Sequence, residues 1–222
     1  MQQGFLLPPG DGLGGVRQRI VDGLAGPGFA VVPGYFSPVV VRALRREAVL
    51  REARGEFRIA AVGRDENHVH NQLVRRDHTL WLERDSLAQC RLLDELEQLR
   101  LTINRDLFLG LFDLEAHFAV YHPGAFYRRH LDAFRGNNAR VVSVVVYLNE
   151  HWQPADGGCL RIWPEPDARR ACLDVAPRAG TLVCFLSERI PHEVLAAARQ
   201  RFSIAGWFRR QQGDALCVDT LL

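Results

Sequence analysis

His130 and Asp132 are the residues best suited to chemistry, because they stand two positions apart at the end of the segment Tyr121–Asp132, YHPGAFYRRHLD. On an extended strand, side chains at positions i and i+2 project from the same face. His192, in the segment IPHEVL, can add a second imidazole. Two histidines and one carboxylate that leave coordination positions open are typical of non-haem iron(II) centres. We therefore expect a metal site built from these three side chains.

Arg201 lies in a second informative run, RFSIAGWF, which has the alternating pattern of a strand. The alternation predicts one face formed by Arg201, Ser203, Ala205 and Trp207, and the other formed by Phe202, Ile204, Gly206 and Phe208. An arginine that faces a pocket between small and aromatic residues is costly unless an anion neutralises it. This strand therefore predicts an anion site.

The run RVVSVVVYLN predicts a neighbouring wall of the same pocket. Its mixed face holds Val141, Ser143, Val145 and Tyr147, and its aliphatic face holds Val142, Val144, Val146 and Leu148. Tyr147 and Ser203 can hydrogen-bond the same carboxylate that Arg201 binds in bidentate fashion. A small dicarboxylate held there at one end and reaching the metal at the other has the geometry of 2-oxoglutarate. Three protein ligands on one octahedral face would leave two positions for this 2-oxo acid and one for dioxygen.

Length and composition predict one domain over residues 1–222, since 47% of the residues are hydrophobic and can form a substantial core. Within it we expect a flexible leader over about 1–13, helical support and early strands over 14–110, and a β core over 111–222. The formal charge of +2 predicts no nucleic-acid surface. No secretion signal and no membrane-length apolar run is evident, so we expect a cytoplasmic protein.

The cysteines predict neither a zinc cluster nor a disulfide framework. They are widely spaced and form no CxxC pair: Cys90, Cys159, Cys172, Cys184 and Cys217. We expect buried, reduced thiols.

Hydrophobic periodicity predicts helices over 16–24, 37–54 and 86–109 and strands at 29–32 and near 73–82. The apolar stripe of the second helix is expected to comprise Val40, Ala43, Leu44, Ala48 and Leu50. Beyond Gly110, short strands are expected at about 114–121, 126–131, 140–149, 159–163, 172–176, 181–186, 192–196, 201–209 and 215–220. The pattern predicts a mainly β protein, an antiparallel sandwich or barrel with helices packed outside it.

A polar segment with three histidines, His68, His70 and His78, precedes the strand near 73–82. A zinc site would need one or two further ligands at suitable spacing, and none is evident. We therefore expect exposed loop histidines. A long polar loop is also a suitable lid over a site elsewhere in the chain.

The segment from Asp77 to Phe208 resembles the prolyl hydroxylase domain enzymes of the Fe(II)/2-oxoglutarate oxygenase superfamily. The similar motifs are YHPGAFYRRHLD, VVVYLNEHWQPADGGCLRIWPEP, ERIPHEV and RFSIAGWF. The resemblance implies a double-stranded β-helix, or jelly-roll, core supported by the N-terminal helices. It also implies Fe(II), 2-oxoglutarate and dioxygen, with ascorbate as a reductant. All 28 basic residues are arginine, which suggests GC-rich coding and a bacterial member.

The resemblance also implies roles for individual residues. The iron ligands would be His130, Asp132 and His192, with Arg201 and Tyr147 on the distal carboxylate of 2-oxoglutarate and Tyr121, Leu160 and Trp207 lining its pocket. The residues near the protein substrate would be Arg140, Asp77, Trp81 and Tyr127. The loop before Asp77 would correspond to a mobile substrate-binding loop.

The expected function is hydroxylation of a prolyl residue in a cytosolic protein, with a translation elongation factor as one candidate. The sequence lacks the cysteine-rich segment of the animal enzymes and the secretion signal of collagen-type enzymes, which disfavours their substrates. Two alternatives stay open: an oxygenase that acts on a free amino acid or small metabolite, and a non-catalytic jelly-roll protein that binds a metal. The sequence leaves the oligomeric state open.

Overall fold

The computed structural model describes residues 12–60, 73–133, 139–165, 169, 171 and 173–211. The helices in these residues are α1 (Leu13–Ala25), α2 (Pro38–Ala53) and α3 (Leu87–Leu107), with a short 3-10 turn at Pro154–Asp156. The strands up to the middle of the chain are β1 (Phe29–Val32), β2 (Arg58–Ile59), β3 (Asp77–Trp81), β4 (Leu111–Tyr121) and β5 (Tyr127–His130). The later strands are β6 (Arg140–Tyr147), β7 (Leu160–Ile162), β8 (Leu173–Val175), β9 (Leu182–Leu186), β10 (His192–Val194) and β11 (Arg201–Arg210).

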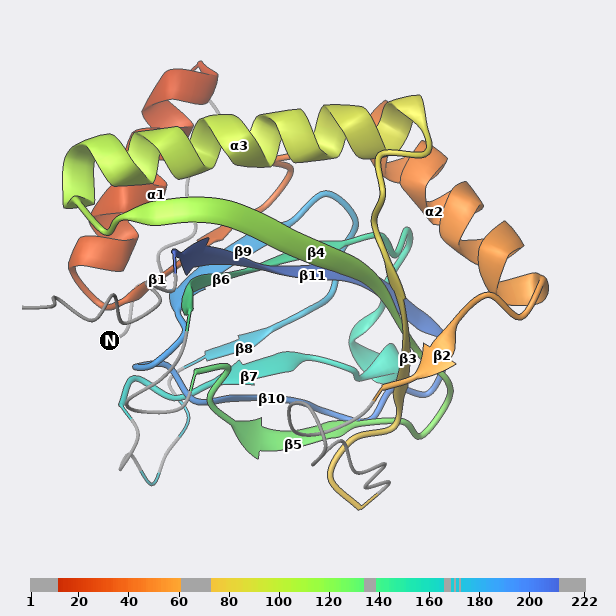
Figure 1. Ribbon diagram of the computed structural model, residues 1–222. Helices are drawn as coiled ribbons and strands as arrows, with labels where there is room; N and C mark the ends of the chain where they lie inside the picture. The colour runs from red at the N-terminus through yellow and green to blue at the C-terminus, as the bar shows by residue number, and fades with distance from the viewer. Residues whose placement is uncertain are drawn as a thin grey trace, which may run out of the picture.

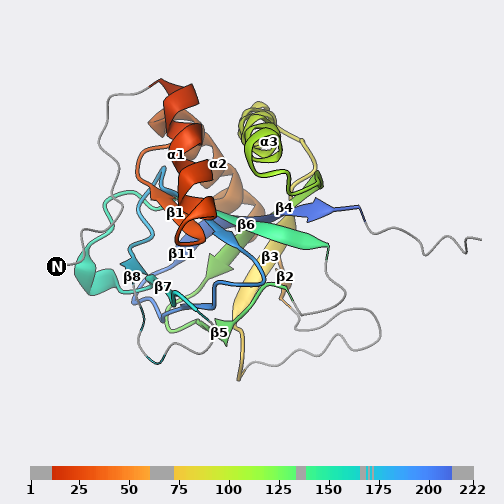
Figure 2. The same ribbon diagram turned by 90° about the vertical axis from the view of Figure 1, so that its left-hand side faces the viewer.

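The strands form two antiparallel sheets that face each other. The larger sheet has the order β1-β9-β6-β11-β4-β3-β2, and the smaller one has the order β5-β10-β7-β8. All three helices cover the outer face of the larger sheet, and the smaller sheet lies on its other side (Figures 1 and 2). The expected class, mainly β with flanking helices, is confirmed. None of the described helices is long and apolar enough to cross a lipid bilayer.

The larger sheet separates two apolar cores because its strands alternate in side-chain direction. The core on the helix side contains Val142, Val144, Val146, Leu148, Phe202, Ile204 and Phe208. The core between the sheets contains Ala119, Tyr121, Tyr147, Leu160 and Phe185. The two faces expected for β6 and β11 are therefore confirmed, except that Val141 packs on the helix side.

Helix α3 is positioned by one apolar stripe. Leu92, Leu96, Leu99 and Ile103 recur at helical spacing and are fully buried in the helix-side core. The Ser86 side chain caps the first turn by accepting a hydrogen bond from the backbone N–H of Gln89 at 3.1 Å. The expected helix is confirmed, but two apolar residues near its ends, Leu87 and Phe108, are exposed.

Helix α2 departs from its expected stripe. Leu44 and Ala48 are buried as expected, but Ala43 and Leu50 are exposed and Val41 is buried instead. Val41, Leu44 and Ala48 are spaced by three and four residues, which is the spacing of one helix face. The sequence offered two overlapping apolar faces, and packing into the helix-side core selects one of them.

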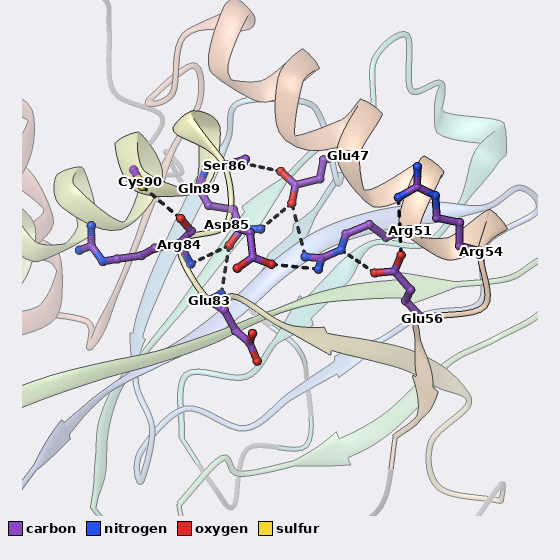
Figure 3. A network of polar contacts seen from close by, with 10 residues as sticks. All are labelled: Glu47, Arg51, Arg54, Glu56, Glu83, Arg84, Asp85, Ser86, Gln89 and Cys90. Atoms are coloured by element: carbon purple, nitrogen blue, oxygen red, sulfur yellow. Dashed lines mark hydrogen bonds and ion pairs between the residues drawn. The ribbon is translucent and has the colours of Figure 1, made fainter.

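A polar network fastens α2 to the start of α3 (Figure 3). The Glu47 carboxylate accepts hydrogen bonds from the Ser86 hydroxyl, at 2.6 Å, and from the Gln89 amide. One turn further along α2, Arg51 binds Asp85 at 2.9 Å. These contacts fix the segment that connects β3 to α3.

The expectation of exposed loop histidines is wrong for His78. This residue lies within β3, is partly buried, and its ring lies 5.2 Å from the ring of His122. Burial, followed by the nearby His122, lowers the pKa of His78. His68, His70, the 61–72 part of the proposed lid and the expected strand at 215–220 lie outside the described residues.

The expectation of buried thiols holds for one of the three described cysteines. Cys184 is fully buried, whereas Cys90 and Cys159 are partly exposed. All three are free thiols. Cys172 and Cys217 lie outside the described residues.

The placement of α3 is tested by two leucines of the same helix. Leu96→Ala should lower the free energy of unfolding by about 2–5 kcal/mol, because it leaves a cavity under the sheet-facing side of the helix. Leu101→Ala, at a position that is 46% exposed, should change it by less than about 0.5 kcal/mol. Urea denaturation measures both values. Equal losses for the two variants would contradict the orientation of the helix.

Candidate active site

Strand pairing brings the two histidines of the expected metal site together. His130 ends β5 and His192 begins β10, and their Cα atoms are direct partners across the antiparallel ladder. The third residue, Asp132, has its carboxylate oxygens 3.4 Å from Nε2 of His130 and 3.7 Å from Nε2 of His192. One potential ligand atom from each residue lies within 4.8 Å of the others. This spacing suits a single metal ion with one ligand atom from each residue.

Asp132 reaches this position by a different route from the one expected. Strand β5 ends at His130, and Asp132 lies in the bend that follows, so the two side chains do not share a strand face. Ser143 on β6 donates a hydrogen bond to the carboxylate at 2.7 Å. Because that hydroxyl proton is used, the 2.9 Å contact between the hydroxyls of Ser143 and Ser187 has Ser187 as the donor. The larger sheet thus orients the carboxylate.

Backbone carbonyls select the tautomer of both imidazoles. Nδ1 of His130 lies 2.7 Å from the carbonyl of Arg128, and Nδ1 of His192 lies 3.2 Å from the carbonyl of Ile190. A carbonyl only accepts hydrogen bonds, so Nδ1 carries the proton and Nε2 presents its lone pair towards Asp132. Burial and the neighbouring His130 lower the pKa of His192 to about 4, which keeps this imidazole neutral at pH 7. Neutral imidazoles are the form that binds metals.

The Asp132 carboxylate is ionised despite its burial. Burial alone would raise its pKa, but His192, His130 and the Ser143 hydroxyl together hold the pKa well below its usual range. One carboxylate and two imidazoles are the donor set of a non-haem iron(II) centre.

Tyr127 and Arg75 support the metal-site face of β5. The ring of Tyr127 stacks on the ring of His130, with centroids 3.6 Å apart and an interplanar angle of 16°. The guanidinium of Arg75 lies 4.7 Å from the Tyr127 ring and forms two hydrogen bonds with Asp77, at 2.6 and 2.7 Å. The fully buried carboxylate of Asp77 is thus matched by a positive charge. Sequence reasoning missed Arg75, since nothing in the run VRRD distinguishes it from its neighbour.

Arg201 forms the second part of the site, and its side chain is almost completely buried, with 1% exposed. Its Nε donates to the carbonyl of Gly158 at 3.0 Å, and its Nη1 donates to the hydroxyl of Ser203 at 3.2 Å. No carboxylate among the described residues pairs with it. The guanidinium lies 5.0 Å from the Tyr121 ring and 5.1 Å from the Tyr147 ring. A buried cation in this state requires an anion from outside the chain.

Two local features fit a carboxylate beside Arg201. The hydroxyl of Tyr147 is buried and has no hydrogen-bond partner among the described residues. Gly158 has a φ of +64°, and a Cβ there would lie 3.2 Å from Cδ of Arg201 and 2.9 Å from Cβ of Ala197. A larger residue at this position would disturb the arginine. The free hydroxyl and the unmatched guanidinium together fit the distal carboxylate of 2-oxoglutarate.

One cavity joins the metal ligands to Arg201. Of the residues expected at the site, it is lined by His130, Asp132, His192, Arg201, Ser203, Tyr121, Leu160, Trp207, Arg140, Asp77 and Tyr127. Tyr147 lies beside Arg201 without lining the cavity, and Trp81 lies outside it with half of its surface exposed. The cavity also contains His117, which sequence reasoning missed. The sequence feature that could have identified His117 is the alternation along β4, which places His117, Ala119 and Tyr121 on one face.

Arg140, expected near a protein substrate, is held at the wall of the cavity. Its guanidinium lies 3.6 Å from the centroid of the Trp207 ring. It also forms an ion pair with Glu115, at 2.8 Å. Its charge is therefore compensated within the protein, and its role in substrate binding stays a prediction.

Comparison with known proteins agrees with this geometry. Residues 116–209 match the family described as the 2OG-Fe(II) oxygenase superfamily. The crystal structure of a Pseudomonas putida prolyl-4-hydroxylase matches 88% of this chain and 100% of that chain, with 46% sequence identity and a TM-score of 0.79. The chain belongs to the 2OG-Fe(II) oxygenase superfamily. It is a prolyl hydroxylase-like 2-oxoglutarate-dependent dioxygenase with a double-stranded β-helix core, and this family uses Fe(II), 2-oxoglutarate and dioxygen.

Animal relatives share the same region. A Caenorhabditis elegans hypoxia-inducible factor prolyl hydroxylase is 29% identical over 231 residues, which cover 91% of this chain and 31% of the relative. The human protein Egl nine homolog 1 is 40% identical over 87 residues, which cover 38% of this chain and 20% of the relative. The chain thus spans a third or less of these two relatives. A prolyl hydroxylase from Trichoplax adhaerens, solved with a hypoxia-inducible factor peptide, has the same fold, with a TM-score of 0.77, 24% identity and coverage of 89% of this chain and 90% of that chain.

Two serines distinguish the metal site from the anion site. Ser143→Ala removes the hydrogen bond that orients Asp132 and should weaken Mn(II) binding about 10- to 100-fold, because such supporting contacts orient the ligands. Ser203→Ala should weaken 2-oxoglutarate binding and leave the Mn(II) affinity within about twofold, because it removes only a contact to Arg201. Titration calorimetry with each ligand measures both effects. The assignment fails if the two variants lose affinity for the same ligand.

Proposed function

We propose that this protein hydroxylates a prolyl residue in another protein, converting 2-oxoglutarate and dioxygen into succinate and carbon dioxide. His130, Asp132 and His192 would hold Fe(II), and Arg201, Tyr147 and Ser203 would hold the distal carboxylate of 2-oxoglutarate. The observation that carries the proposal is a buried, uncompensated Arg201 in the same cavity as the His–Asp–His group. A structural metal site would need no such arginine. When bound, iron supplies the oxidative chemistry that side chains lack.

The chain's own residues prepare the site for this reaction. Carbonyl groups hold both imidazoles with Nε2 facing the metal position, and Ser143 holds the carboxylate. Arg201 would fix one end of 2-oxoglutarate so that its 2-oxo acid end reaches the metal. The buried side chains of Tyr121 and Leu160 line the cavity between the two parts and exclude water from it.

The proposal of a prolyl substrate rests on the relatives. The Pseudomonas putida protein, at 46% identity over its whole length, is a prolyl-4-hydroxylase. The Trichoplax adhaerens protein binds a hypoxia-inducible factor peptide. We infer a prolyl residue of a cytosolic protein as the substrate here, with a translation elongation factor as one candidate, in a bacterial cell. Tyr127 and Arg140, which line the cavity, and Trp81, beside it, are proposed to contact the substrate chain.

The cosubstrate assignment is tested at Arg201. Arg201→Gln should raise the dissociation constant of 2-oxoglutarate at least about 100-fold, because a bidentate, charge-assisted contact in a buried site is lost. Arg105→Gln is the matched control, since Arg105 lies on the exposed side of α3 with 69% of its side chain accessible. Calorimetry with the Mn(II)-loaded protein measures the constants. Unchanged affinity in Arg201→Gln would remove the basis for the proposed function.

The reaction itself is tested in cells. Proteins from cells with and without the enzyme should differ by hydroxyproline, seen in mass spectrometry as a gain of about 16 mass units for the one oxygen atom inserted. The Asp132→Ala variant should lose both this modification and succinate formation, because the remaining two imidazoles cannot hold the metal tightly. Turnover of free proline without any modified protein would select the small-molecule alternative.

A further inference from the structure

His117 is a buried polar residue of the cavity that neither the metal nor the anion site uses. It lies on β4 and is 4% exposed. Its ring lies between two indoles, 5.2 Å from the ring of Trp81 and 5.5 Å from the ring of Trp207. In the strand ladder its partners are Ala205 of β11 and Trp81 of β3. The wall opposite the smaller sheet therefore carries an imidazole framed by aromatic rings.

The hydrogen bonding of His117 determines which of its ring nitrogens can accept a hydrogen bond from a ligand. Nδ1 lies 3.0 Å from the carbonyl of Phe118, so Nδ1 carries the proton and donates it. Burial, and then the nearby Arg75, lower the pKa of His117 to about 4, so the imidazole is neutral. Nε2 is therefore a neutral acceptor. No residue in the described parts of the chain donates a hydrogen bond to it.

Trp207 offers the complementary group in the same cavity. Its Nε1–H is buried and has no hydrogen-bond partner among the described residues, although an indole N–H can only donate. Arg140 lies against the ring face and holds the indole in one orientation. Unpaired buried donors are uncommon in native proteins and indicate a missing partner.

The charges around this pair are already balanced. Arg75 is matched by Asp77, with two hydrogen bonds, and Arg140 is matched by Glu115. A carboxylate or ammonium ligand would find no unmatched partner here and would lose its hydration. The wall is therefore suited to an uncharged group that both accepts and donates a hydrogen bond.

We propose that Nε2 of His117 and Nε1 of Trp207 bind the backbone N–H and C=O of one residue of the substrate chain next to the target proline, because in an extended chain these two groups of a residue point to the same side. The peptide N–H donates to His117, and the peptide C=O accepts from Trp207. The inference rests on the proposed function and identifies two residues that would select the substrate. Free proline carries an ammonium and a carboxylate instead of a neutral peptide group. The pair thus favours a proline within a polypeptide over the free amino acid.

The test uses a synthetic peptide that spans the proline found by mass spectrometry, together with two analogues. Each analogue replaces one of the two peptide N–H groups nearest the proline with an ester oxygen, which removes a single donor. His117→Phe retains the ring contacts but removes the acceptor, and Trp207→Phe retains an aromatic ring beside Arg140 but removes the donor. His122→Phe is the matched control, because His122 is partly exposed and does not line the cavity.

We expect His117→Phe and Trp207→Phe each to raise the KM of the parent peptide about tenfold, the size of one hydrogen bond, with a smaller change in kcat. For the wild type and for His122→Phe, the KM of one ester analogue should be about tenfold higher than that of the parent peptide. For His117→Phe, the KM values of this analogue and of the parent peptide should be equal. His117→Gln, which restores an acceptor, should recover part of the affinity. Non-additivity between the ester and His117→Phe identifies the direct contact.

Additive effects of the ester and His117→Phe, or an unchanged KM in His117→Phe, would overturn the inference. Calorimetry of 2-oxoglutarate binding and thermal denaturation accompany each His117 variant, so that a general loss of structure is distinguished from a loss of peptide binding. If the cell experiment yields no modified proline, the proposed function itself fails, and this is a separate outcome. If the parent peptide is turned over but the ester and the variants act independently, only the role of His117 and Trp207 is rejected.

Discussion

The pairing of β5 with β10 is the constraint on which the site depends, because it sets His130 directly opposite His192. A shift of one residue in this register would turn one imidazole to the other face of the smaller sheet. The ladder continues from β10 to β7, which keeps β10 in the interior of the smaller sheet. Asp132 then needs only the short bend after β5 to reach Ser143 on the larger sheet. The metal position is therefore formed jointly by both sheets, and their packing is a condition for binding.

The second constraint is an unfavourable one. Burying Arg201 without a carboxylate of the chain costs stability, and the two apolar cores on either side of the larger sheet must offset that cost. The helices contribute here, since the stripe of α3 completes the helix-side core. The stability that the two apolar cores supply thus permits the site to contain an uncompensated buried charge. Binding of an anion relieves the penalty, so affinity for the cosubstrate and stability of the fold are linked.

The alternation of side-chain types along the strands was the most informative property of the sequence. Apart from Val141, it separated the two faces of β6 and β11, and so predicted that Ser203 and Arg201 face the cavity and that Ser143 lies on the side of Asp132. It failed where the chain leaves regular structure, as at Asp132, because alternation says nothing about a bend. It also could not identify Arg75, whose role depends on a partner two residues away and a ring on another strand. In α2, two overlapping apolar faces made the stripe ambiguous until tertiary contact selected one.

The distribution of charge explains how one cavity can order three different ligands. The ionised Asp132 beside the imidazoles of His130 and His192 provides a negative site for a metal, and Arg201 provides a positive site for a dicarboxylate. Along the remaining wall, Arg75 and Arg140 are neutralised by Asp77 and Glu115. A neutral polypeptide segment would have the smallest desolvation cost at that wall, because it carries no charge there. Charge therefore assigns the metal, the dicarboxylate and the proposed polypeptide to separate parts of the cavity, and the proposed contacts with His117 and Trp207 would set the direction of the polypeptide.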